Sequence, residues 1–326
     1  MIVNEDCIKH LKTIEDNYFD SVVTDPPYEL GFMGKIWDST GIAFTTELWK
    51  EVYRTLKPGG YLLSFAASRN YHRMAVAIED SGFEIRDQIM WIYGSGFPKS
   101  LNIGKALDKK QGNKRKVIGT TNQQDIRSGN YVLGPQDRID VPVTVGTSEW
   151  EGWGTALKPA HEPICMARKP ISEKSVTDNV LKHGTGGINI DGCRVTTDEN
   201  ISNHSRSAES AVSKGIFGDS KEQETHQTKG QEKGRFPANL IHDGSDEVVS
   251  KFPNTKGWTS QKHNTFNPYG GNSLHASETE RDGFHVGYND DGSAARFFYC
   301  PKANKKEKGD TNHPTVKPVE LMRYLV

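Results

Sequence analysis

The first hundred residues alternate between short apolar runs and stretches with a single apolar face, and this alternation constrains the fold most. Residues 19–23 and 61–65 predict buried strands. Between them, residues 45–57 carry apolar side chains at four-residue spacing, which predicts an amphipathic helix. A helix at about 70–80 and a strand at 85–93 continue the pattern. Strands that alternate with helices predict a parallel sheet built from βαβ units, and therefore an α/β fold.

The sequence changes character after about residue 94. Polar and turn-forming residues dominate from there, except at residues 162–167, which predict one more strand. A mean hydropathy of -0.68 with 34% apolar residues indicates a polar portion beside an ordinary core. Residues 171–294 are either a loop-rich recognition insert or partly disordered. We expect four parts: a core at 1–110, connecting loops with a core strand at 111–170, the insert at 171–294, and a return to the core at 295–326.

Composition excludes several classes of protein. The net charge of -1 does not by itself indicate nucleic-acid binding, although a basic surface can be local. Residues 114–116 and 302–308 are basic clusters for which a solvated surface is the simpler interpretation. The four cysteines include no C-x-x-C pair, so we expect neither a zinc site nor a disulfide framework. Without an apolar leader or an 18-residue apolar run, the sequence predicts a soluble, cytoplasmic protein.

The stretch Asp25-Pro-Pro-Tyr28 directly follows the first predicted strand. Asp25 therefore lies at the carboxyl end of a strand, where open α/β sheets bind their ligands. Pro26 and Pro27 have fixed φ angles and no N–H, so their carbonyls can point outward. Tyr28 adds a flat aromatic surface. This arrangement suits a planar molecule that carries an amino group, although a polyproline turn capped by a surface tyrosine explains the same residues.

Four pieces of sequence in a fixed order give a resemblance to a known family. They are Asn4–Cys7, Asp25–Tyr28, a polar insert, and His313–Pro318. Together they resemble the S-adenosylmethionine-dependent amino-methyltransferases of DNA, in the permuted β arrangement that places the catalytic half before the cofactor half. The phrases "GRFPANLIHDGS" and "SAARFFYCPKA" resemble phage and bacterial members. The resemblance implies a Rossmann-like methyltransferase sheet, with the insert as target-recognition region and double-stranded DNA as partner.

The resemblance also implies a mechanism. The target base is flipped out of the duplex, and Tyr28 stacks on it. The Asp25 carboxylate and the Pro26 carbonyl accept hydrogen bonds from the two N–H groups of the exocyclic amine, and Pro27 completes the motif. Adenine N6 is favoured over cytosine N4 as the target. Methylation at cytosine C5 needs a cysteine nucleophile in a Pro-Cys context, and this chain has only the reverse dipeptide, Cys300-Pro301.

For the cofactor, S-adenosylmethionine, the resemblance carries Asp6 and Cys7 onto the adenine ring. A helix N-cap followed by a small buried residue explains the same dipeptide. The resemblance also places Thr315, Lys317 and Pro318 at the methionine end of the cofactor. Asp25 is a further candidate cofactor-binding residue.

The sequence departs from the family pattern near Val326. The family's Phe-x-Gly-x-Gly loop and the acidic residue for the ribose hydroxyls do not follow Pro318. Tyr93–Gly96 is no substitute, because Phe97-Pro98 stands where a helix should begin. We therefore expect an incomplete sheet, completed by a homodimer partner or by a complementing C-terminal fragment. One alternative is a catalytically weak DNA-binding remnant. Another is methylation of RNA or of a protein glutamine, which Asp25 and the long insert disfavour.

Overall fold

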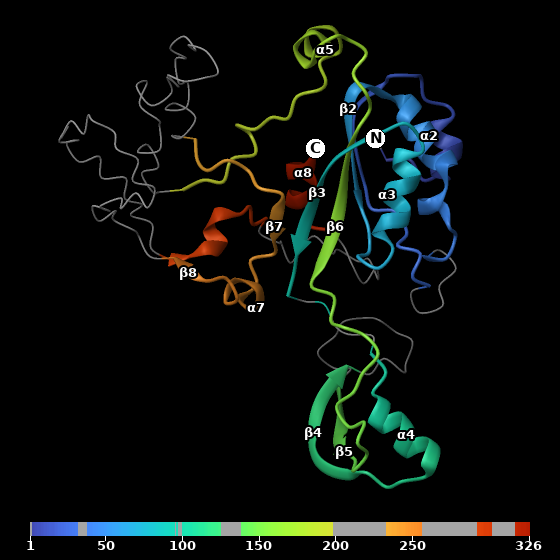
Figure 1. Ribbon diagram of the computed structural model, residues 1–326, viewed down its shortest axis with the longest axis vertical. Helices are drawn as coiled ribbons and strands as arrows, with labels where there is room; N and C mark the ends of the chain where they lie inside the picture. Colours follow the sequence, from blue (N-terminus) through green and yellow to red (C-terminus); the bar gives the residue numbers. More distant parts are fainter. Residues whose placement is uncertain are drawn as a thin grey trace, which may run out of the picture. The chain divides into compact units, whose positions relative to one another are not determined.

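The chain divides into two compact units. The structure, a computed structural model, describes residues 2–31, 38–94, 96, 100–124, 138–197, 233–255, 292–301 and 317–326 (Figure 1). The first unit comprises Met1–Gly186 and Pro301–Val326, and the second comprises Gly187–Cys300. Among the described residues, no helix combines the length and the hydropathy that crossing a membrane requires.

A mixed sheet forms the centre of the first unit. Its strands are β1 (Phe19–Thr24), β2 (Leu56–Phe65), β3 (Glu84–Ile92) and β6 (His161–Arg168), which pair in the order β1-β2-β6-β3. The expected parallel pairing is confirmed for β1 and β2. However, β6 lies between β2 and β3 and runs antiparallel to both. An antiparallel neighbour needs no crossover helix, so the chain can leave the sheet after β3 and return beside it as β6.

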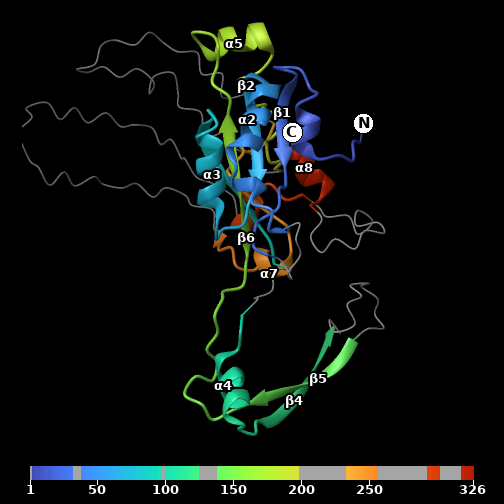
Figure 2. The same cartoon turned by 90° about the vertical axis from the view of Figure 1, so that its right-hand side faces the viewer.

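The helices pack where the apolar periodicity predicts them. The helix α2 (Thr46–Thr55) ends two residues earlier than expected, since Leu56 already has extended backbone angles. Pro58 explains this end, because a residue before proline disfavours the helical region. The next helix, α3 (Tyr71–Glu79), lies with α2 on one side of the sheet (Figures 1 and 2). The fully buried side chains of this core include Trp49, Leu56, Leu62 and Ile78.

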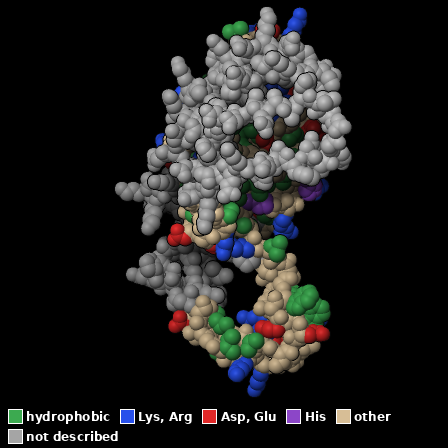
Figure 3. Space-filling model, turned by 60° about the vertical axis from the view of Figure 1, so that its left-hand side comes forward, with side chains coloured by type: hydrophobic (Ala, Val, Ile, Leu, Met, Phe, Trp, Pro, Cys, Tyr) green, Lys and Arg blue, Asp and Glu red, His purple; other side chains and the backbone are tan. Residues whose placement is uncertain are grey.

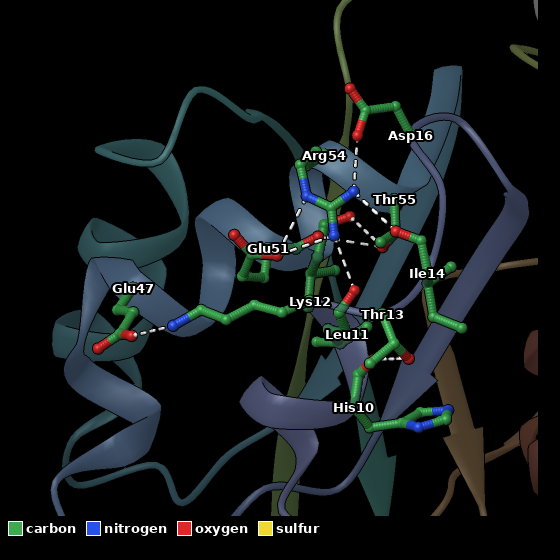
Figure 4. A network of polar contacts seen from close by, with 11 residues as sticks. His10, Leu11, Lys12, Thr13, Ile14, Asp16, Glu47, Glu51, Arg54 and Thr55 are labelled. Atoms are coloured by element: carbon green, nitrogen blue, oxygen red, sulfur yellow. Dashed lines mark hydrogen bonds and ion pairs between the residues drawn. The ribbon is translucent and has the colours of Figure 1, made fainter.

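The short helix α1 (Cys7–Leu11) buries none of its residues and is held by α2 instead. Arg54, in the last turn of α2, donates to the carbonyls of Leu11 and Ile14 at 2.7 and 2.8 Å (Figure 4). Its guanidinium also contacts Asp16 at 2.6 Å and Glu51 at 2.9 Å. A five-residue helix is not stable alone. The Arg54 contacts therefore fix α1, and with it the Asp6-Cys7 dipeptide.

A buried asparagine fixes the beginning of β2. Asn179, in α5 (Val176–His183), is fully buried. Its amide nitrogen donates to the carbonyls of Pro58 and Thr185, both at 2.8 Å, and its oxygen accepts the N–H of Ser172 at 3.1 Å. One side chain thus joins three backbone segments around the start of β2, and the Thr185 hydroxyl also donates to the Pro58 carbonyl at 2.6 Å.

Asn179→Ala is expected to lower the free energy of unfolding by about 3 kcal/mol, because buried polar groups lose their partners and a cavity forms. Urea unfolding followed by far-ultraviolet circular dichroism measures this change. The matched control is Lys174→Ala at an exposed position nearby, for which we expect less than about 0.5 kcal/mol. Equal unfolding midpoints for the two variants would contradict the structural role of Asn179.

An additional substructure is inserted between β3 and β6. It contains α4 (Ile103–Gln111), β4 (Lys116–Gln124) and β5 (Arg138–Val145), and β4 pairs antiparallel with β5. We call residues 101–124 and 138–155 the α4–β4–β5 unit. The sequence predicts connecting loops from residue 111, whereas the structure forms two strands there. The signal was present in the β-branched runs "KVIGTT" and "VPVTV", which favour strands.

The second unit is described only in parts. It contains β7 (Leu240–His242), α7 (Asp246–Val249) and the short pair β8 (Asn254–Thr255) and β9 (Gly292–Ser293). The buried His242 packs near the ring of Phe252, which in turn lies 5.6 Å from that of Phe298. The remaining helix, α8 (Val319–Leu325), belongs to the first unit. The role of residues 171–294 in target recognition stays a prediction.

Candidate active site

Four side chains from three distant segments meet at one edge of the sheet. Asp25 directly follows β1. The ammonium of Lys317 lies 3.0 Å from Oδ2 of Asp25, 3.0 Å from the Tyr28 hydroxyl and 2.9 Å from Oε2 of Glu162. The Tyr28 hydroxyl donates to the same Glu162 oxygen at 2.9 Å. We call these four residues the Asp25–Lys317 cluster.

The sheet topology explains why Glu162 reaches this cluster. Because β1 and β2 are parallel, with Thr24 opposite Ser64, their carboxyl ends lie at the same edge. In the antiparallel neighbour β6, Ile164 pairs with Phe65 at the end of β2. Glu162 lies two residues before Ile164 and so extends past that edge, on the same face of β6 as Ile164. The amino end of β6 therefore meets the carboxyl end of β1.

The electrostatics of the cluster depend on one cation between two carboxylates. The side chain of Lys317 is 9% exposed, against 30% for Asp25 and 13% for Glu162. Burial, together with the negative charges of Asp25 and Glu162, raises the pKa of Tyr28, so its hydroxyl remains a hydrogen-bond donor. Burial and the nearby Glu162 likewise raise the pKa of Tyr93 to about 12. The ammonium of Lys317 also lies over an aromatic ring.

That ring belongs to Phe65, at the end of β2, with its centroid 4.8 Å from the Lys317 nitrogen. A cation over a ring face is attracted by the ring quadrupole. In the described segments, no three His, Cys, Asp or Glu side chains gather in a way that could hold a metal ion. The arrangement offers acceptors, one cation and an aromatic ring, which are the groups that orient an amine and its planar ring.

The structure places the other residues of the Asp-Pro-Pro-Tyr motif around the cluster. Pro26 is buried and Pro27 is partly buried. The backbone carbonyl of Tyr28 accepts a hydrogen bond from the side chain of Asn70 at 2.5 Å, which fixes the end of the motif to the start of α3. Pro318 is the N-cap residue of α8 and so anchors Lys317 to a helix. Thr315 lies outside the described residues.

Asp6 and Cys7 lie apart from the cluster, at the start of α1. Asp6 is the N-cap, and its Oδ1 accepts the N–H of Lys9 at 2.9 Å. The N-cap interpretation is thus confirmed for Asp6, but Cys7 is exposed rather than buried. The Cys7 N–H is the first of the helix, and such N–H groups have no acceptor within the helix. In the part of the chain that the structure describes, no hydrogen bond joins either residue to the cluster.

Sequence reasoning missed Glu162 and Asn70. The strand at residues 162–167 was predicted, but Glu162 received no role. A carboxylate at the start of the apolar run "PICMA" was the available signal, since glutamate is seldom buried without a partner. The antiparallel register that places it beside Asp25 could not be derived from strand patterns alone.

Comparison with known families decides the class of this chain. A family model described as a DNA methylase, N6_N4_Mtase, matches residues 19–326. The chain belongs to this family. The match starts at the first residue of β1 and includes all four residues of the Asp25–Lys317 cluster. It confirms the resemblance to the amino-methyltransferases and gives no support to the alternative of a DNA-binding remnant.

This N6_N4_Mtase chain also matches individual relatives, at low sequence identity. It is 23% identical over 231 residues to the type II methyltransferase M.HindIII of Haemophilus influenzae, covering 58% of this chain and 64% of the relative. It is 32% identical over 113 residues to M.HpaI of Haemophilus parainfluenzae, covering 33% and 36%. The chain therefore spans less than two thirds of the length of these relatives.

Solved structures of other methyltransferases give a further, weaker likeness. The chain is similar to a putative DNA modification methylase, TTHA0409 of Thermus thermophilus, with a TM-score of 0.28 and 18% identity, over 52% of this chain and 53% of the other. A complex described as M1.HpyAVI with SAM matches at a TM-score of 0.23 and 15% identity, over 51% and 52%.

Proposed function

We propose that this chain is an S-adenosylmethionine-dependent methyltransferase that modifies the exocyclic amine of a base in double-stranded DNA. The observation that carries the proposal is the Asp25–Lys317 cluster, in which a carboxylate at a strand end is held beside an aromatic ring. Family membership supports the class of reaction. The description of the family, DNA methylase, supports DNA as the substrate.

The residues of the cluster have separate tasks in this proposal. Lys317 occupies only Oδ2 of Asp25, so the other carboxylate oxygen remains for an amine N–H. The Pro26 carbonyl accepts the second N–H, which orients the nitrogen lone pair away from the ring. Tyr28 stacks on the flipped base, which contributes on the order of 1–3 kcal/mol. Glu162 and Lys317 hold the Tyr28 hydroxyl and fix the ring.

The residues present fit the cofactor at its adenine end. When bound, S-adenosylmethionine supplies an electrophilic methyl group. The second oxygen of Asp6 can accept the adenine amine, and the Cys7 N–H can donate to the adjacent ring nitrogen. Lys317 has a different task from the one that the resemblance implies. Its ammonium is already occupied by Asp25, Tyr28 and Glu162, so we infer that it positions the motif rather than the methionine end.

The target atom is proposed to be adenine N6 rather than cytosine N4, because aspartate opens the motif. The test is incubation of the chain with S-adenosylmethionine and a duplex library that contains all short sequences. Digestion and mass spectrometry of the nucleosides then measure N6-methyladenine and N4-methylcytosine. The first product is expected, and a reaction without cofactor is the control. Methylation of RNA or protein, with unmodified DNA, would contradict the proposal.

Tyr28→Phe is expected to retain more activity than Tyr28→Ala. The phenylalanine ring keeps the stacking surface and loses one hydroxyl, whose hydrogen bonds contribute about 1 kcal/mol. The alanine loses the stacking contribution of roughly 1–3 kcal/mol as well. Steady-state methylation of one duplex by both variants checks the order. If both were equally inactive, the hydroxyl and not the ring face would be the essential group.

A further inference from the structure

The α4–β4–β5 unit leaves the sheet at the edge that carries the Asp25–Lys317 cluster. The last register pair of β3 and β6 joins Ile92 to His161, and His161 directly precedes Glu162. The two chain segments remain together at Tyr93, whose N–H donates to the carbonyl of Ala160 at 3.0 Å. The segments that lead to and from the unit are therefore joined at the Tyr93–Ala160 hydrogen bond, and Ala160 lies two residues before Glu162.

The unit pairs two of its acidic side chains with Arg115, whereas its lysines and two other acidic residues, Asp140 and Glu149, are exposed. Arg115 donates to Asp108 at 2.5 Å and to Glu151 at 2.6 Å, and Asp108 is buried. The two carboxylates are thereby paired within the unit. Five lysines are exposed, and none of them forms an ion pair in the described part of the chain. They are Lys105, Lys109, Lys110, Lys114 and Lys116.

The stability of the helix α4 explains the positions of only some of these exposed lysines. Lys109 and Lys110 lie in the last turn of α4, where cations favour the helix dipole. Lys114 and Lys116 lie beyond the helix, so that explanation does not apply to them. Lys105 and Lys109 are four residues apart on one helix face, where like charges destabilise the helix. An anionic partner that lies along the unit would compensate this repulsion.

The shape and side chains of the unit suit a nucleic acid. A helix and a two-stranded ribbon are the elements that fit the grooves of duplex DNA. Basic, acidic and hydrophobic side chains are exposed on this unit, which lies lowest in Figure 3. The hydrophobic ones include the edge-packed pair Trp150 and Trp153, which are 40% and 58% exposed.

We propose that the α4–β4–β5 unit binds the phosphate backbone of the DNA beside the target base, through its exposed lysines. This inference rests on the proposed function. It assigns the unit a contact that does not depend on base sequence, because phosphates carry no sequence information. The tether beside Glu162 restricts the bound phosphates to the neighbourhood of the cluster.

The test compares two triple variants of the full chain with the same change in net charge. The first is Lys109→Gln, Lys114→Gln and Lys116→Gln. The control replaces three exposed lysines outside both the unit and residues 171–294, namely Lys9, Lys12 and Lys50, by glutamine. Fluorescence anisotropy measures the affinity for one duplex between about 50 and 200 mM salt. The slope of log affinity against log salt concentration is expected to fall by up to about 2.7 in the first variant, at about 0.9 for each lost phosphate contact. The control slope is expected to stay unchanged.

The outcomes separate this inference from the proposed function. Equal slopes for wild type and the first variant, with wild type active in methylation, would overturn the lysine contacts alone. If the first variant had a reduced slope but the wild type showed no methylation, the lysine contacts would stand and the proposed methyltransferase activity would be contradicted. The exposed apolar side chains could instead mediate self-association. Ile118, in β4, is 60% exposed. If Ile118→Asp dissociated a dimer while all salt slopes stayed equal, the surface would belong to a second copy and the proposal would be wrong.

Discussion

Asp25→Ala is expected to remove nearly all methyl transfer, with kcat lowered by about 100- to 1000-fold, while the protein stays folded. The reaction loses the preorganised acceptor for the amine, and removing one such group typically lowers kcat by about 100- to 1000-fold. Stability should change little, because the Asp25 side chain is 30% exposed and Lys317 retains Glu162 as a partner. Activity and stability therefore respond differently to this change.

The matched control is Asp20→Ala, on β1, the strand that Asp25 directly follows. The Asp20 side chain is 72% exposed and pairs with Lys57, away from the cluster. Transfer of a radiolabelled methyl group to a duplex gives kcat, and thermal unfolding gives the midpoint for each variant. We expect Asp20→Ala to resemble wild type in both. Substantial turnover by a folded Asp25→Ala protein would refute the assigned role.

Lys317→Met is expected to lower both stability and activity. It removes the only cation that the structure places between Asp25 and Glu162 among the described residues, and leaves two carboxylates close together. Breaking a buried ion pair typically destabilises by about 3–5 kcal/mol, and the partial exposure of Asp25 places the expected loss near about 3 kcal/mol. Denaturant unfolding measures the loss. Activity should fall as well, since Asp25 and Tyr28 lose a shared contact.

A second substitution distinguishes charge imbalance from lost packing. In the Lys317→Met background, Glu162→Gln removes one of the two like charges and keeps an acceptor for the Tyr28 hydroxyl. The double variant should therefore be more stable than Lys317→Met alone. The single variant Glu162→Gln should not be more stable than wild type. The double-mutant cycle measures this coupling. Strict additivity would indicate that the charges of Lys317 and Glu162 do not interact.

The sequence predicts the fold and the site unequally, for physical reasons. Local periodicity marks β1, α2, α3 and β3, because each is amphipathic or apolar by itself. It also places Asp25 at a strand end. The position of β6 between β2 and β3 depends on long-range pairing, which local patterns do not encode, and Glu162 is therefore missed. Residues 116–124 and 138–145 lack the apolar alternation of a core strand, and none of residues 116–121 and 140–145 is buried.

The sequence separation within the cluster has a consequence for biosynthesis. Asp25 and Lys317 are joined across 292 positions of the chain. At a synthesis rate of about 5–20 residues per second, roughly 15–60 seconds pass between the two on the ribosome. During that time Asp25 and Glu162 emerge without their cation, and the Tyr28 hydroxyl lacks one of its two partners. A nascent chain can thus form β1 and β2 early, yet it acquires the complete Asp25–Lys317 cluster only when Lys317 has been synthesised and α8 docks. Premature termination before residue 317 would release a protein with a folded core and without the cation of this cluster.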